Sequence, residues 1–207
     1  DGETVSKTFS VQDYVEAVVA DDRFPDELKD LCKKLINYGH YAQLMTAPVR
    51  EWTIGEDYPE IMVYFAPTVT DDVFADDTFK VEKTGSSDQV TRVTLSLALD
   101  HKTEVYMYLT ADTEPEVTVD GEAAAVYLME DGRYRAVIPG VPSYLLAEKH
   151  TVIVNGTLTY SLSALCYVPM VLNSSSFSEN DKNAVKALYE YYDASVAYLE
   201  YLSGSND

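Results

Sequence analysis

The chain is poor in the residue types on which most catalytic and metal sites are built. Its 207 residues include three histidines (His40, His101, His150), two cysteines (Cys32, Cys166) and one tryptophan (Trp52). The histidines are isolated from one another in sequence, and the HExxH, GxSxG, Walker and GxGxxG patterns are absent. We therefore expect a non-enzymatic protein with no catalytic residues, no metal ligands and no cofactor. A hydrolase that uses two carboxylates stays open, because 35 acidic residues offer many pairs and none is singled out.

Positive charge is also scarce. Fifteen basic residues stand against 35 acidic ones, which gives a formal net charge of −20. Such a field repels a phosphate backbone and an anionic membrane surface, so we expect no nucleic acid as a partner. No apolar run approaches the roughly 20 residues of a membrane helix, which predicts no membrane insertion. No basic and apolar signal opens the chain at Asp1, so we expect an exported piece of a longer protein whose signal and anchor lie outside it.

The two cysteines are 134 positions apart (166 − 32), and each lies in an apolar pattern of helical period. No CxxC pattern is present and no histidine follows at metal-ligand spacing. We interpret them as buried free thiols. A disulfide that joins the two helical regions remains the alternative, since sequence does not fix their separation in space.

Short runs of strand-forming residues fill the middle of the chain. Val93, Leu95 and Leu97 alternate with polar residues, and Tyr106 and Tyr108 fall on the face opposite the aliphatic side chains. The predicted strands are 90–99, 105–109, 117–119, 123–129, 134–138, 152–154 and 157–160, after strand-like runs at 61–65 and 78–81. Asp-Gly and Asn-Gly dipeptides mark the turns between several of them. This spacing predicts an Ig-like antiparallel β-sandwich over residues 60–161.

Helical periodicity precedes and follows this region. It predicts an N-terminal helical segment over residues 8–50, with helices at 10–19 and 25–45, and C-terminal helices over 162–203, at 162–172 and 178–202. In the last helix Glu190 falls on the expected solvent face, and in the second helix Tyr41 falls off the apolar stripe. The simplest α+β architecture packs the two helical regions together as a small bundle beside the sandwich.

Two acidic pairs, Asp71-Asp72 and Asp76-Asp77, flank Val73-Phe74-Ala75. Oxygen-rich loops of this kind can hold Ca²⁺, a hard cation. The EF-hand spacing is absent, and a solvated acidic loop is the alternative that we favour.

Several segments, taken in order, resemble a repeated module of large surface proteins from gut anaerobic bacteria. They are 35–43 (LINYGHYAQ), 93–97 (VTLSL), 117–121 (VTVDG), 159–167 (TYSLSALCY) and 187–191 (ALYEY). The resemblance implies an extracellular module associated with the bacterial cell surface. Some related surface proteins are immunoglobulin-binding and superantigen-like, and they engage the heavy-chain variable domain of antibodies. The resemblance therefore implies a host protein, the heavy chain of an antibody Fab, as the partner.

Tyrosine is the strongest compositional bias, at 17 residues against six phenylalanines and one tryptophan. Its rigid ring and hydroxyl suit binding surfaces, although packing of helix against sandwich would also use them. The candidate partner-binding residues are Tyr189, Tyr198 and Tyr201 on the last helix, with Tyr106 and Tyr108 on the sheet. Two other functions stay open. One is a carbohydrate-binding module that uses Trp52, Tyr58 and Tyr64, and the other is a structural spacer.

Overall fold

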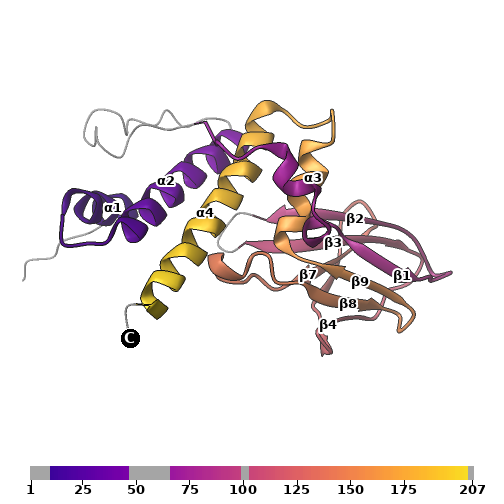
Figure 1. The fold of residues 1–207 in the computed structure, drawn as a ribbon. Helices are drawn as coiled ribbons and strands as arrows, with labels where there is room; N and C mark the ends of the chain where they lie inside the picture. The colour runs from indigo at the N-terminus through magenta and orange to yellow at the C-terminus, as the bar shows by residue number, and fades with distance from the viewer. Residues whose placement is uncertain (1–9, 47–65, 99–102, 205–207) are drawn as a thin grey trace, which may run out of the picture.

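The computed structural model describes residues 10–46, 66–98 and 103–204, which form two antiparallel β-sheets with helices at one end (Figure 1). The predicted α+β class with a β-sandwich is confirmed. One sheet has the order β1 (Glu82–Gly85), β9 (Leu158–Leu162), β8 (His150–Val154), β4 (Val117–Val119) and β5 (Glu122–Ala123). The other has the order β2 (Val90–Ala98), β3 (Glu104–Ala111), β7 (Tyr134–Ile138) and β6 (Val126–Leu128).

The core lies where the inward residues of these strands meet. Because side chains alternate along a strand, every second residue of β3 is buried: Val105, Met107 and Leu109. Val152 and Val154 of β8, in the other sheet, are also buried in this core. The hairpin turns follow the predicted chemistry, since Asp120-Gly121 and Asn155-Gly156 each adopt positive φ at both residues.

The single strand predicted over 123–129 is wrong, because the chain changes sheets inside it. The Ala124 amide donates to the carbonyl of Val117, in the five-stranded sheet, at 2.9 Å. The next carbonyl, that of Ala125, accepts from Val137 of the four-stranded sheet at 3.1 Å. The residues on both sides of the crossing are apolar, so the local sequence does not reveal it.

The strand predicted over 78–81 is also wrong. The acidic stretch forms two 3₁₀-helices, η1 (Asp71–Ala75) and η2 (Asp77–Phe79), which bury Phe74 and Phe79 with their rings edge-to-face. Asp76 begins η2 by accepting a hydrogen bond from the Thr78 amide at 2.7 Å. The run predicted over 61–65 lies outside the described residues.

The helices are α1 (Val11–Ala20), α2 (Asp26–Thr46), α3 (Tyr167–Leu172) and α4 (Glu179–Gly204), with short 3₁₀ turns η3 (Ser143–Leu145) and η4 (Ala164–Cys166). A capping box begins α1, since Ser10 and Asp13 exchange hydrogen bonds. Ser178 and Asp181 do the same at the start of α4. The helix predicted over 162–172 starts later, because Leu162 is still paired in β9.

The predicted bundle is confirmed, as α2 lies along α4 in antiparallel orientation (Figure 1). Lys34 of α2 contacts Glu190, the Tyr38 ring stacks on that of Tyr191 at 5.8 Å, and Tyr41 packs on alanines earlier in α4. Two expectations are wrong here: Tyr41 is buried rather than accessible, and Glu190 is 7% exposed rather than on the solvent face. Both residues face the neighbouring helix, which helical periodicity alone does not place.

Glu190 is buried with a full set of donors. Its carboxylate accepts hydrogen bonds from Lys34 Nζ at 2.8 Å, from the Thr68 amide at 2.6 Å and from the Val69 amide at 3.1 Å. Burial raises the pKa of Glu190, but these hydrogen bonds outweigh it and hold the pKa below its ordinary value of 4.5. One carboxylate therefore joins α2, α4 and the segment that leads into η1.

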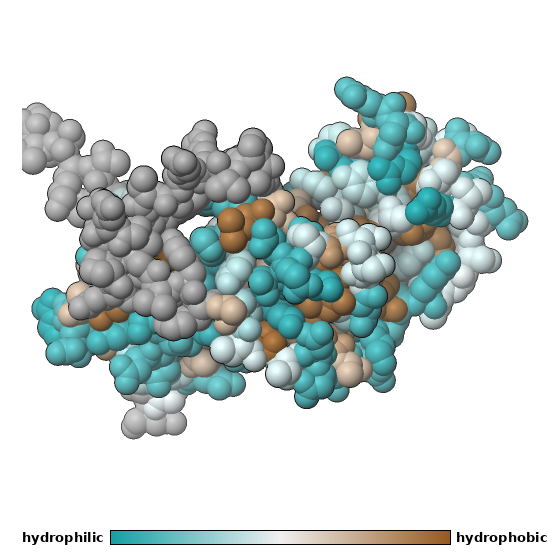
Figure 2. All heavy atoms as spheres, turned by 90° about the horizontal axis from the view of Figure 1, so that it is seen from above, coloured by the Kyte–Doolittle hydropathy of each residue, from teal (hydrophilic) through white to brown (hydrophobic). Residues whose placement is uncertain are grey.

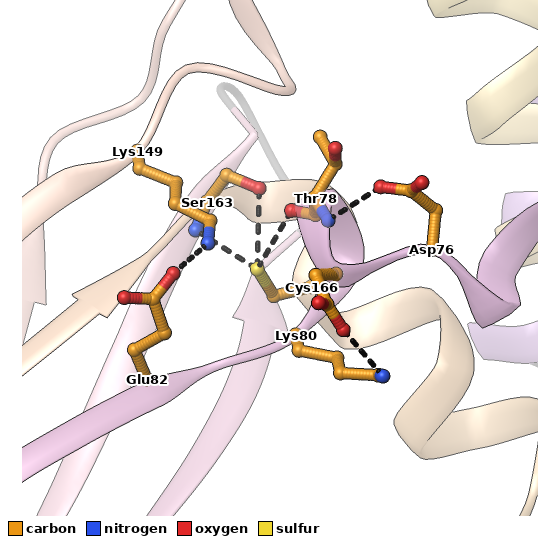
Figure 3. A network of polar contacts seen from close by, with 8 residues as sticks. Asp76, Thr78, Lys80, Glu82, Lys149, Ser163 and Cys166 are labelled. Atoms are coloured by element: carbon orange, nitrogen blue, oxygen red, sulfur yellow. Dashed lines mark hydrogen bonds and ion pairs between the residues drawn. The ribbon is translucent and has the colours of Figure 1, made fainter.

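Cys166 lies at a second junction, between η2, the end of β9 and α3 (Figure 3). Its sulfur accepts from the Ser163 amide at 3.3 Å and lies 3.9 Å from the carbonyl oxygen of Thr78. Both Cys32 and Cys166 are buried and free, so the predicted free thiols are confirmed and the alternative disulfide is not formed. Burial raises the pKa of Cys32.

Hydrophilic side chains cover most of the face that Figure 2 shows, and hydrophobic residues appear there in small separate groups. In the described part of the chain, no helix is both long and apolar enough to cross a membrane.

Candidate binding face

The outer face of the four-stranded sheet gathers three tyrosines and two arginines: Tyr106, Tyr108, Tyr127, Arg133 and Arg135. We call these five residues the Tyr–Arg face. The strand register brings them together, because Tyr108 of β3 is paired with Arg135 of β7, which is paired with Tyr127 of β6. The aliphatic side chains of β3, together with Ala136 and Ile138 of β7, point to the opposite, core side. Alternation thus leaves a row of large side chains outside.

The arginines lie over the tyrosine rings. The guanidinium carbon of Arg135 is 4.6 Å from the ring centre of Tyr106 and 5.3 Å from that of Tyr127. Arg133 lies over Tyr108 at 4.6 Å. Such cation–π contacts contribute about 0.5–1 kcal/mol each at exposed sites. They hold long side chains in one place before any partner arrives.

The two arginines differ in their carboxylate partners. Arg133 forms an ion pair with Asp131, with Nη2 2.6 Å from Oδ2 and Nε at 2.8 Å. The Arg133 guanidinium holds the pKa of Asp131 below its ordinary value of 3.8. Arg135 makes no ion pair with any residue that the structure describes, and its Nε is buried without a hydrogen-bond acceptor.

The acidic residue beside this row is Glu104. Its carboxylate accepts a hydrogen bond from the Tyr106 hydroxyl at 3.4 Å. Desolvation, together with this negative charge, raises the pKa of Tyr106. Tyr106 and Tyr108 are half-buried, whereas Tyr127 is 50% exposed at the sheet edge.

The candidate tyrosines of α4 lie elsewhere. Tyr198 and Tyr201 stack with ring centres 6.4 Å apart near the C-terminal end of the helix, which Figure 1 places away from both sheets. Leu199 and Leu202 are exposed beside them.

Tyr189 has a packing role in the structure. Its ring contacts those of Phe74 at 4.9 Å and Phe79 at 5.9 Å, and it lies against the main core. The five candidate tyrosines therefore fall into three places: Tyr106 and Tyr108 on the sheet, Tyr198 and Tyr201 at the helix end, and Tyr189 over η1 and η2.

Sequence reasoning missed Tyr127, Arg133 and Arg135. A usable signal was present, because Tyr134, Ala136 and Ile138 alternate as the inward residues of the predicted strand. Because side chains alternate along a strand, Arg135 must then point outward, and so must Arg133, two residues earlier.

Three of the four aspartates in the two acidic pairs at η1 and η2 have partners within the protein. Asp71 contacts Lys186, Asp77 contacts Lys80, and Asp76 accepts from the Thr78 amide. Across residues 10–46, 66–98 and 103–204, no three His, Cys, Asp or Glu side chains are placed to hold a metal ion. The aromatic group considered for sugar binding, Trp52, Tyr58 and Tyr64, lies outside the described residues.

Comparison of the chain with protein-family models, with curated proteins and with solved structures finds no match.

Proposed function

We propose that the chain is a non-enzymatic binding module of a bacterial surface protein, located outside the cell, and that the Tyr–Arg face docks on a host protein. The partner in this proposal is the heavy-chain variable domain of an antibody. One observation carries the choice of surface: three tyrosines and two arginines lie side by side on one sheet face, already in stacking contact. The sequence resembles a surface-protein module some of whose relatives bind immunoglobulins, and this resemblance supports the choice of partner.

The chemistry of the face suits protein recognition. Tyrosine and arginine are enriched among the residues that dominate binding energy, because they offer large contact area together with hydrogen-bond donors. Stacking also reduces the side-chain entropy that a flexible arginine would lose on binding. A broad sheet surface of this kind suits the flat framework surface of a variable domain.

The direct test is binding of the purified chain to a panel of Fab fragments from different heavy-chain families, measured by biolayer interferometry. We expect saturable binding that is restricted to particular heavy-chain families. Tyr108→Ala and Tyr127→Ala should each weaken binding by about tenfold or more, since truncating a central anchor costs upwards of about 1.4 kcal/mol.

Tyr14→Ala is the matched control, because Tyr14 is an exposed tyrosine on α1, outside the face. Its Fab affinity should equal that of the wild type. Loss of binding in Tyr198→Ala or Tyr201→Ala, with Tyr108→Ala unaffected, would move the site to the end of α4. Absence of binding with Fab at about 50 μM would refute the antibody proposal, because it would mean a binding free energy less favourable than about −6 kcal/mol.

A further inference from the structure

Arg135 is the one arginine of the Tyr–Arg face whose charge is left unpaired. Its guanidinium lies between the rings of Tyr106 and Tyr127, and its Nε is buried with no acceptor. Because solvent does not reach Nε, a docking group would meet the guanidinium at its Nη atoms. The chain carries 35 acidic residues, yet none of those described forms an ion pair with Arg135.

The other arginines of the described part of the chain show that the pairing is selective. Arg23 and Arg133 each bind an aspartate two residues earlier, Asp21 and Asp131, through Nε and Nη2. Arg92 is exposed, so water can hydrate it fully. Arg135 alone combines partial burial, aromatic contacts and an unused Nε.

We propose that Arg135 determines the specificity of the face by binding a carboxylate, from an aspartate or glutamate side chain of the protein partner. This inference rests on the function proposed above and adds the chemistry of the contact. A guanidinium has planar donors that match the two oxygens of a carboxylate, and contact with aromatic rings fixes the plane in which the donors lie. Exclusion of water by the two tyrosines and by the partner would strengthen the ion pair.

The net charge of −20 does not prevent such a contact. At physiological salt, exposed charges separated by more than about 8 Å are largely screened. The groups closest to the bound carboxylate would be Arg135 and the tyrosine rings, with Arg133 already neutralised by Asp131. Glu104 is the nearby acid, and it is hydrogen-bonded to the Tyr106 hydroxyl.

The first test follows the arginine Nε–H signals of the folded chain by ¹H–¹⁵N NMR. The buried Nε of Arg135 should exchange slowly with water and give a sharp signal, which Arg135→Lys removes and so assigns. The probes are acetyl-Tyr-Glu-Tyr-amide, its glutamine counterpart and N-acetylneuraminic acid, each at about 1–20 mM because a single ion pair binds weakly.

We expect the glutamate peptide to shift the Arg135 signal at least three times as far as the glutamine peptide does, and further than it shifts the Arg133 signal. Equal shifts with both peptides, or no shift of Arg135 with any probe, would overturn the carboxylate site. A response to N-acetylneuraminic acid alone would assign the face to an acidic sugar and overturn the protein side chain as its ligand.

The second test uses a Fab that binds the wild-type chain. Arg135→Gln should weaken binding by about tenfold or more, and Arg135→Lys should restore only part of it, because lysine lacks the planar fork. Arg133→Gln should reduce Fab affinity less than Arg135→Gln does, since the Arg133 guanidinium is already paired with Asp131. Arg23→Gln, in the exposed turn between α1 and α2, should bind as the wild type does.

The two proposals fail in different ways. If no Fab binds but the glutamate peptide shifts Arg135 selectively, the antibody is the wrong partner and the carboxylate site stands. If a Fab binds and Arg135→Gln has unchanged affinity with an unchanged melting temperature, the carboxylate contact is refuted and the binding function stands.

Discussion

Glu190 is the residue whose burial has the widest structural consequence. It lies between Lys34 of α2 and the amides of Thr68 and Val69, so it crosslinks three segments that are far apart in sequence. A buried carboxylate with this set of donors is stabilising only while every donor stays in place.

Glu190→Gln should therefore destabilise the fold by about 2 kcal/mol, because neutral glutamine makes weaker hydrogen bonds and leaves the Lys34 ammonium without its counter-ion. The free energy of unfolding is measured by urea denaturation, with an unchanged m-value as the check on two-state behaviour. Glu200→Gln, on the exposed part of the same helix, is the control and should change stability by less than about 0.5 kcal/mol.

The same residue gives a pH dependence with a fixed sign. Its folded-state pKa lies below the ordinary value of 4.5, so the unfolded chain binds the proton first as the pH falls. The contribution of Glu190 is fully present above pH 4.5 and is lost as the pH drops through the folded-state pKa. Stability curves of wild type and Glu190→Gln should converge in that range, and parallel curves would contradict this account.

Cys32 and Cys166 are expected to be unreactive in the native state because both thiols are buried. Titration with a thiol-reactive chromophore should detect essentially no thiol in buffer and two per chain in denaturant without reductant. Two thiols reacting at once in buffer would show that the helical regions open readily. No thiol reacting in denaturant would mean that a disulfide exists.

At the scale of elements, the edge strand β1 is held through a close approach at its end. Gly85 adopts φ of +74° opposite Leu158 of β9, and a Cβ built there would lie 2.0 Å from the carbonyl oxygen of Thr157. Such a contact is impossible without moving one of the strands. Glycine is therefore required for space as well as for its conformation.

Gly85→Ala should destabilise the protein by more than about 2 kcal/mol and increase amide exchange in β1. Gly132→Ala is the matched control, since Gly132 has φ of +81° but nothing within 4 Å of the added methyl group. It should cost about 1 kcal/mol, the strain of the left-handed conformation alone. Equal losses in the two variants would show that the strands adjust to the clash.

For the whole molecule, the net charge of −20 is the dominant electrostatic feature. Like charges distributed over the surface repel one another in the compact state, and salt screens this repulsion. Most ion pairs of the structure include an exposed side chain, so screening them costs little.

Raising NaCl from about 10 to 300 mM should therefore raise the melting temperature by a few degrees, as measured by differential scanning calorimetry. CaCl₂ at matched ionic strength separates screening from site binding. A rise in melting temperature similar to that in NaCl would indicate screening alone, as expected if Asp71, Asp76 and Asp77 keep their partners within the protein. A much larger rise with CaCl₂ would reveal a specific Ca²⁺ site.

The sequence alone determined what depends on near neighbours in the chain. Alternation in β3 predicted that Tyr106 and Tyr108 share the outer face, and helical periodicity predicted a helix from residue 10, where Ser10 and Asp13 cap α1. The Asp-Gly and Asn-Gly turns are equally local, because positive φ is a property of the residue itself. From these signals the α+β class and the two-sheet sandwich could be predicted.

Tertiary structure decided what depends on residues far apart in sequence. Glu190 and Tyr41 are buried because another helix covers them, and the chain changes sheets at Ala124 because each sheet offers a different hydrogen-bond partner. The Tyr–Arg face exists only through the register that sets Arg135 beside Tyr108 and Tyr127. Periodicity indicates which way a side chain points relative to its own strand or helix. Only the packed fold determines which other element that side chain contacts.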